Sequence, residues 1–96
     1  MAKILIVGDN IGQIDLIATT IEGLGYEVVT VYESMDAMDV AMEESFDLVI
    51  LEANMGGING YELADTLRGD PSIESEMPIV MIDSGFLDKD RILSTR

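Results

Sequence analysis

Four short runs of apolar, largely β-branched residues are separated by segments with a helical pattern. The runs are Lys3–Val7, Val28–Val31, Leu48–Leu51 and Ile79–Ile82. Continuous apolar runs of this length are typical of parallel strands that are buried on both faces. Glu27 and Thr30 make the second run the most polar, so we expect it at the edge of the sheet.

The first helix is predicted between the first two runs. Asn10 can cap it, and Gln13 follows in capping-box spacing. Apolar residues then recur at helical intervals, at Ile14, Ile17, Ala18, Ile21 and Leu24. Gly25 ends the helix in the usual way for a glycine at a carboxyl terminus.

Two further helices follow, one after each of the next two strands. The second runs from an N-cap at Ser34 to Glu44, the third covers Tyr61–Arg68, and Leu87–Leu93 has a weaker helical pattern. Strands that alternate with helices through short connections predict a parallel sheet with right-handed crossovers. The predicted fold class is therefore α/β, a doubly wound parallel sheet in a single domain over residues 1–96.

Charge and composition exclude several classes of function. The 96 residues include 19 acidic and 5 basic ones, for a formal net charge of −14, and 48% are apolar. So few cations cannot form the basic face that binding to nucleic acid or anionic lipid requires, so we expect neither partner. No apolar run is long enough to cross a bilayer, and there is no cysteine. We expect a cytoplasmic protein whose acidity serves solubility or a protein partner with a basic surface.

The third run leads into the most informative segment, Phe46–Gly60, with the sequence FDLVILEANMGGING. Glu52 ends the strand, and a glycine-rich loop follows it. The segment resembles the phospho-acceptor strand of response-regulator receiver domains in the CheY-like superfamily. The segments KILIVGDN, GYEV and RGDPSIESEMPIVMIDS resemble that family's first strand, second strand and connection into the fourth strand. The resemblance implies strand order 2-1-3-4, with the first helix on one face and the other two on the opposite face.

The resemblance also implies a set of site positions. In that family, two acidic residues after the first strand bind magnesium, and an aspartate on the third strand accepts a phosphoryl group. The matching positions here are Gly8 and Asp9 for the acidic pair, and Glu52 for the acceptor. A threonine or serine after the fourth strand is matched by Asp83, with Ser84 beside it. The family's lysine after the fifth strand and its aromatic residue on that strand have no counterpart, because we expect the fifth strand and helix to be missing.

Every part of the family's site is therefore altered or absent, which predicts a degenerate receiver that is not an enzyme. The main hypothesis is a phosphorylation-independent interaction module in two-component or phosphorelay signalling. One alternative is a phosphorelay receiver that uses Glu52 or Asp9, and another is an assembly subunit that has inherited the scaffold. The acidic corner of Asp9, Glu52 and Asp83 either binds Mg²⁺ or Ca²⁺ or is a solvated remnant.

Without a fifth strand, the fourth would expose an apolar edge with free backbone groups, which soluble proteins normally cover. We therefore expect a homodimer, or a protein partner that supplies the cover. The residues expected at this contact are Ile79, Val80, Met81, Ile82, Leu87 and Leu93.

Overall fold

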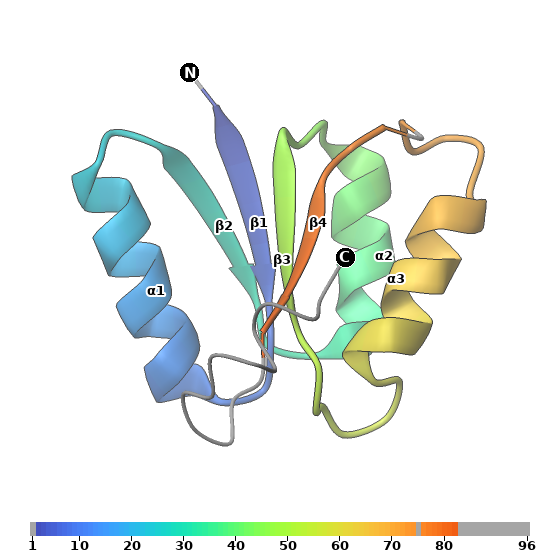
Figure 1. The fold of residues 1–96 in the computed structure, drawn as a ribbon, viewed down its shortest axis with the longest axis horizontal. Coiled ribbons are helices and arrows are strands. Elements are labelled where there is room, and N and C mark those ends of the chain that lie inside the picture. The colour runs from blue at the N-terminus through green and yellow to red at the C-terminus, as the bar shows by residue number, and fades with distance from the viewer. Residues whose placement is uncertain (1, 75, 83–96) are drawn as a thin grey trace.

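The computed structural model describes residues 2–74 and 76–82, which form a four-stranded sheet and three helices. The elements are β1 (Lys3–Val7), α1 (Ile11–Gly23), β2 (Glu27–Val31), α2 (Ser34–Glu43), β3 (Leu48–Glu52), α3 (Gly60–Gly69) and β4 (Ile79–Ile82). All strand pairs are parallel, in the order β2-β1-β3-β4 (Figure 1). None of the helices in these ranges is long and apolar enough to cross a membrane. The predicted doubly wound α/β fold and its strand order are confirmed.

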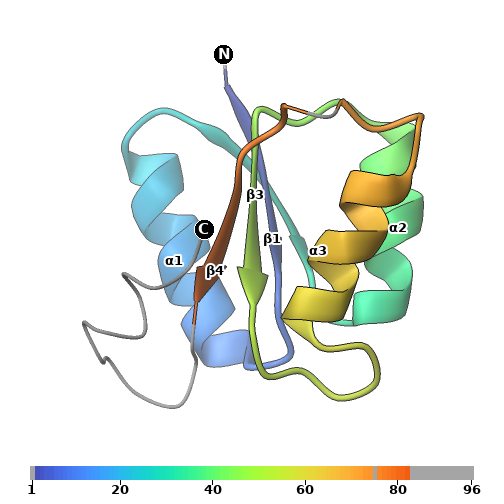
Figure 2. The ribbon, with the colours of Figure 1, turned by 45° about the vertical axis from the view of Figure 1, so that its right-hand side comes forward.

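Each face of the sheet has its own hydrophobic core. Ile4 and Ile6 of β1 pack with α1 on one face, whereas Leu5 and Val7 pack with α2 and α3 on the other. This division follows from the alternation of side chains along a strand. Figure 2 shows α1 on one side of the sheet and α2 with α3 on the other, as the resemblance implied.

The ends of several elements differ from the prediction. The N-cap of α2 is Glu33, which makes no capping bond through its side chain, and Ser34 is already helical, so the predicted cap was wrong. Ser34 is buried, with 4% of its surface exposed, so its side chain packs in the interior instead of capping the helix. The helix ends at Glu43, one residue before the predicted end. β2 begins one residue earlier than predicted, β3 ends one residue later, and α3 extends one residue further at both ends.

The apolar stripe of α1 is shorter than predicted. Ile14 and Ala18 are buried, but Leu24 is 72% exposed. Leu24 lies one position beyond the last helical residue and serves as the C-cap. Its side chain therefore leaves the face that packs on the sheet.

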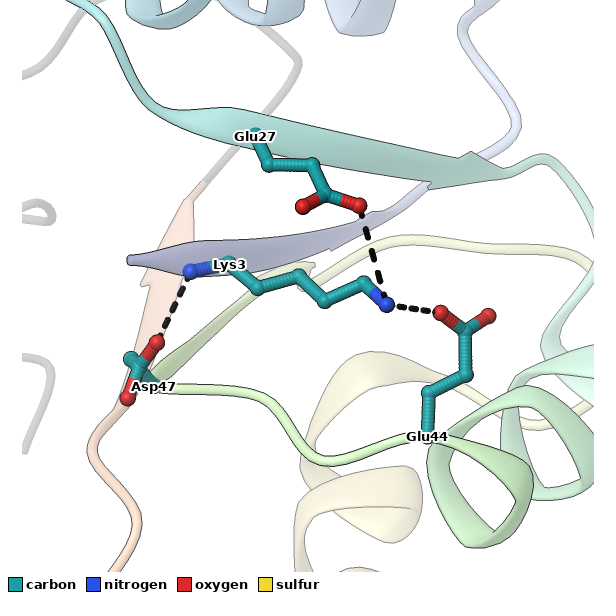
Figure 3. A network of polar contacts seen from close by, with 4 residues as sticks. All are labelled: Lys3, Glu27, Glu44 and Asp47. Atoms are coloured by element: carbon teal, nitrogen blue, oxygen red, sulfur yellow. Dashed lines mark hydrogen bonds and ion pairs between the residues drawn. The ribbon is translucent and has the colours of Figure 1, made fainter. Parts of the chain in front are cut away.

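One lysine joins the amino-terminal ends of β1 and β2 to the connection between α2 and β3 (Figure 3). The Lys3 ammonium donates a hydrogen bond to the Glu44 carboxylate and lies 3.7 Å from Oε2 of Glu27. The backbone N–H of Lys3 donates to Oδ2 of Asp47 at 2.8 Å, and its ammonium lies 5.7 Å from the centroid of the Phe46 ring. The hydrogen bond with Glu44 raises the pKa of Lys3 above its ordinary value.

At the opposite edge of the sheet, the first turn of α3 lies directly against the end of β3. Asn59 and Glu62 form a reciprocal capping box that fixes the start of this helix. A Cβ atom at Gly60 would lie 2.4 Å from the backbone oxygen of Glu52 and 2.7 Å from Sδ of Met81. The helix can approach the strand this closely only because residue 60 has no side chain.

Replacing Lys3 should lower stability at neutral pH, and this loss should shrink at alkaline pH. The folded-state pKa of Lys3 lies above 10.5, so its ion pairs stabilise the fold fully below that pH and lose this effect as pH rises through the folded-state value. We expect the stability difference between wild type and Lys3→Met to stay level from about pH 7 to pH 10 and then to shrink. Urea unfolding of both proteins at a series of pH values measures this difference. The stability difference between wild type and Glu44→Gln should likewise stay level to about pH 10 and then shrink. A difference that stays level above pH 10 for both variants would contradict the ion pairing.

A methyl group at residue 60 should destabilise the fold. Gly60→Ala forces β3 and α3 apart, and overpacking of this kind costs about 1–3 kcal/mol. Gly69→Ala is the matched control at the other end of α3, because nothing lies within 4 Å of the Cβ position there. Urea unfolding should show a loss for Gly60→Ala and no loss for Gly69→Ala. Equal stability of the two variants would mean that the helix shifts without cost.

Candidate functional site

The candidate site lies at the carboxyl edge of the sheet, where β1 and β3 end side by side. Ligand sites of open parallel sheets lie at this edge. Gly8 and Asp9 follow β1, and Glu52 is the last residue of β3. The loop from β3 to α3 contacts this edge through a hydrogen bond from Gly56 to Asp9. The structure therefore brings together three of the positions that the sequence singled out.

Glu52 is turned into the protein rather than toward solvent. Its relative exposure is 0%. Oε1 accepts hydrogen bonds from the backbone N–H groups of Asp9 at 2.9 Å and Asn10 at 3.2 Å. Oε2 is also buried and has no hydrogen-bond partner in the described part of the chain. The carboxyl group thus bridges the end of β3 to the turn that starts α1.

Gly8 provides the space that this carboxyl group occupies. A Cβ atom at position 8 would lie 2.5 Å from Oε1 of Glu52 and 2.6 Å from Cδ1 of Ile14. These separations are far inside van der Waals contact, so no side chain fits while Glu52 keeps its position. In effect, the longer glutamate places its carboxyl group where a side chain at position 8 would begin. Sequence reasoning treated the two substitutions as separate losses and missed their spatial connection.

Asp9 has a different environment. Its side chain is exposed, and its Oδ2 accepts a hydrogen bond from the backbone N–H of Gly56 at 2.8 Å. This contact holds the β3–α3 loop against the β1–α1 turn. Asp9 also lines a cleft of about 230 Å³, with Met35 at the start of α2 and Met55 in the loop among its other walls. Gly57 continues the loop with φ = 78°, a conformation that favours glycine.

The predicted capping box at the start of α1 is only half formed, which corrects the sequence interpretation. The Asn10 side chain accepts a hydrogen bond from the N–H of Gln13, as expected. The reciprocal bond is replaced, because the N–H of Asn10 donates to Glu52 instead. The side-chain oxygen of Gln13 is left buried and unpartnered among the described residues.

Several predicted positions lie outside the described residues. These are Asp83, Ser84, Leu87 and Leu93. The described part of the predicted contact surface is β4, in which Met81 is buried and Val80 is 43% exposed. The homodimer through this strand stays a prediction.

A divalent cation, which the resemblance implies, needs several oxygen ligands directed at one point. Within residues 2–74 and 76–82, no three acidic, histidine or cysteine side chains are arranged to hold a metal ion. Gly8 supplies no carboxylate, Oε1 of Glu52 is engaged by two amides, and Oδ2 of Asp9 is engaged by a third. The described residues therefore do not fit such an ion.

Comparison with known sequences gives a consistent family. A model described as the response regulator receiver domain matches residues 4–92. The transcriptional regulatory protein CpxR homolog of Haemophilus influenzae is 32% identical over 93 residues, which are 97% of this chain and 39% of that protein. The chain spans only 32% to 39% of the length of the first curated relatives that it matches.

Solved structures agree with the sequence matches. The chemotaxis response regulator CheY4 of Vibrio cholerae is 32% identical with a TM-score of 0.79, over 84% of this chain and 67% of that one. A chain from the structure of histidine kinase ThkA in complex with the response regulator protein TrrA is 27% identical with a TM-score of 0.80, over 93% of this chain and 74% of that one. With the family model covering almost its whole length, this chain belongs to the response regulator receiver domains of two-component signalling.

Proposed function

We propose that this receiver domain works without phosphorylation at the usual acceptor position, as a non-enzymatic protein–protein interaction module in two-component signalling. The observation that carries the proposal is the orientation of Glu52. Its carboxyl group is fully buried and bound to the backbone amides of Asp9 and Asn10. A side chain committed to an internal structural contact is poorly placed to act as a nucleophile.

Phosphoryl transfer depends on an acceptor oxygen that meets the donor in line and on cations that neutralise the developing charge. Glu52 presents neither oxygen to solvent, because its whole side chain is inaccessible. The described residues also offer no metal-binding set. Losing even one preorganised electrostatic partner commonly costs a transfer reaction about 3–4 kcal/mol. The buried acceptor oxygens and the lack of a metal-binding set among the described residues together lead us to expect negligible phosphoryl transfer to Glu52.

The same contacts support a constant surface rather than a switched one. Glu52 joins β3 to the β1–α1 turn, and Asp9 joins that turn to the β3–α3 loop through Gly56. These segments border the acceptor position at the carboxyl edge of the sheet. Here internal hydrogen bonds hold them without any added group. Such a domain is suited to present one fixed surface to a protein partner.

A signalling protein is the proposed partner. The structure of ThkA in complex with TrrA, which includes a chain similar to this one, contains a histidine kinase with a response regulator. This likeness favours a two-component partner over a general assembly role. The exposed Asp9 carboxylate gives one specific alternative, a receiver that is phosphorylated at Asp9 instead of at Glu52.

The first prediction concerns phosphorylation. Incubation with acetyl phosphate and magnesium should leave the intact mass of the protein unchanged, because Glu52 is buried and the described residues provide no metal-binding set. Mass spectrometry of wild type, Glu52→Gln and Asp9→Asn measures the outcome. A phosphorylated species that disappears only in Glu52→Gln would refute the proposal. One that disappears only in Asp9→Asn would establish the alternative acceptor.

The second prediction concerns the space shared by residues 8 and 52. Gly8→Asp alone should destabilise the fold strongly, because its Cβ meets Oε1 of Glu52 and Cδ1 of Ile14. Adding Glu52→Asp withdraws one methylene and should recover part of the loss, giving a coupling energy of about 1–3 kcal/mol. Urea unfolding of the two single variants and the double variant completes the cycle. Additive effects would show that Glu52 does not occupy the space beside Gly8.

A further inference from the structure

The outer edge of β2 is open along the described part of the chain. The strand pairs with β1 and stands at the end of the strand order. The N–H of Glu27 and the carbonyl of Val31 both bond toward β1. Since backbone groups alternate in direction along a strand, Val28 and Thr30 direct their N–H and C=O groups away from the sheet. These groups form a short template for an added strand.

Acidic side chains line both sides of this edge. On the α2 side, a cleft of about 390 Å³ is bounded by Asp36, Asp39 and Glu43, with Val31 and Val40 among its apolar walls. The three acidic residues share one side of α2, at intervals of three and four positions.

On the α1 side, a cleft of about 260 Å³ is bounded by Asp15 and Glu22, and Ala18 and Val28 form apolar parts of its wall. The hydroxyl of Tyr32, the residue after β2, donates a hydrogen bond to Oδ1 of Asp15 at 2.5 Å. Among the residues that the structure describes, no lysine or arginine lines either cleft. The free backbone groups of β2 therefore lie between two negatively charged walls.

We propose that this edge, Val28–Tyr32 with the acidic walls of α1 and α2, docks an extended segment of a partner protein rich in lysine and arginine. The segment adds as a strand beside Val28 and Thr30. Its alternate side chains enter the two clefts, where aliphatic stems pack on the apolar walls and cationic heads reach the carboxylates. This inference rests on the proposed function, because it names the surface and the partner chemistry of the interaction module.

Charge selects this occupant over the other candidates. A second copy of the chain would bring two equally acidic edges together, within a molecule of formal net charge −14. Nucleic acid and anionic membranes would be repelled by the same walls. A basic strand gains from both the backbone pairing and the complementary charge.

The test uses a short fluorescent peptide in which lysine and arginine alternate with valine, titrated into the whole chain and followed by anisotropy. Asp36→Asn with Asp39→Asn should weaken binding about tenfold at about 0.15 M salt. The matched control, Asp65→Asn with Glu76→Gln, removes the same charge from exposed positions elsewhere and should weaken it less than about twofold.

A second measurement separates strand pairing from charge attraction. Methylation of alternate peptide nitrogens, placed to face β2, should abolish binding. The unmodified peptide should slow hydrogen exchange at the N–H groups of Val28 and Thr30. Equal binding of the methylated peptide, equal weakening by the control variant, or no binding at all would overturn the proposal. None of these outcomes alters the acetyl phosphate result, so failure of the docking site and failure of the proposed function are distinguishable.

Discussion

The carboxyl edge of the sheet, where β1 and β3 end, depends on the hydrogen bonds from the backbone N–H groups of Asp9 and Asn10 to Glu52. They cross from the end of β3 to the turn after β1, between residues more than forty positions apart in the chain. The requirement for glycine at position 8 and the loss of half of a capping box both follow from this one placement of a carboxyl group. The side chain of residue 52 is thereby fully buried within the domain.

Most of the fold was predictable because its signals are local. Continuous apolar runs located the strands, and Asn10 and Gly25 located the two ends of α1. Leu24 was placed wrongly because a periodic pattern cannot show where a helix stops. The resemblance to a known family added the strand order, which periodicity alone does not give.

The candidate site was less predictable, because its geometry depends on contacts between distant segments. The sequence identified Gly8, Asp9 and Glu52 as the relevant positions but not the direction of the Glu52 side chain. That direction depends on free space beside Gly8 and on two backbone amides of the turn after β1, a neighbouring strand in the sheet. The bond from Gly56 to Asp9 was missed for the same reason, because a backbone donor carries no signal in the sequence.

The close fit of Glu52 beside Gly8 constrains the order in which these two residues can be exchanged. The resemblance matches position 8 to an acidic residue and position 52 to an aspartate, so the present pair differs from that pattern at two positions that share one space. A glutamate that arrived first would collide with the side chain at position 8, whereas a glycine that arrived first would leave only a small void. Of the two orders of substitution, glycine at position 8 followed by glutamate at position 52 therefore avoids the collision. The step back is obstructed, since an aspartate restored at position 8 would have no room until residue 52 had shortened again.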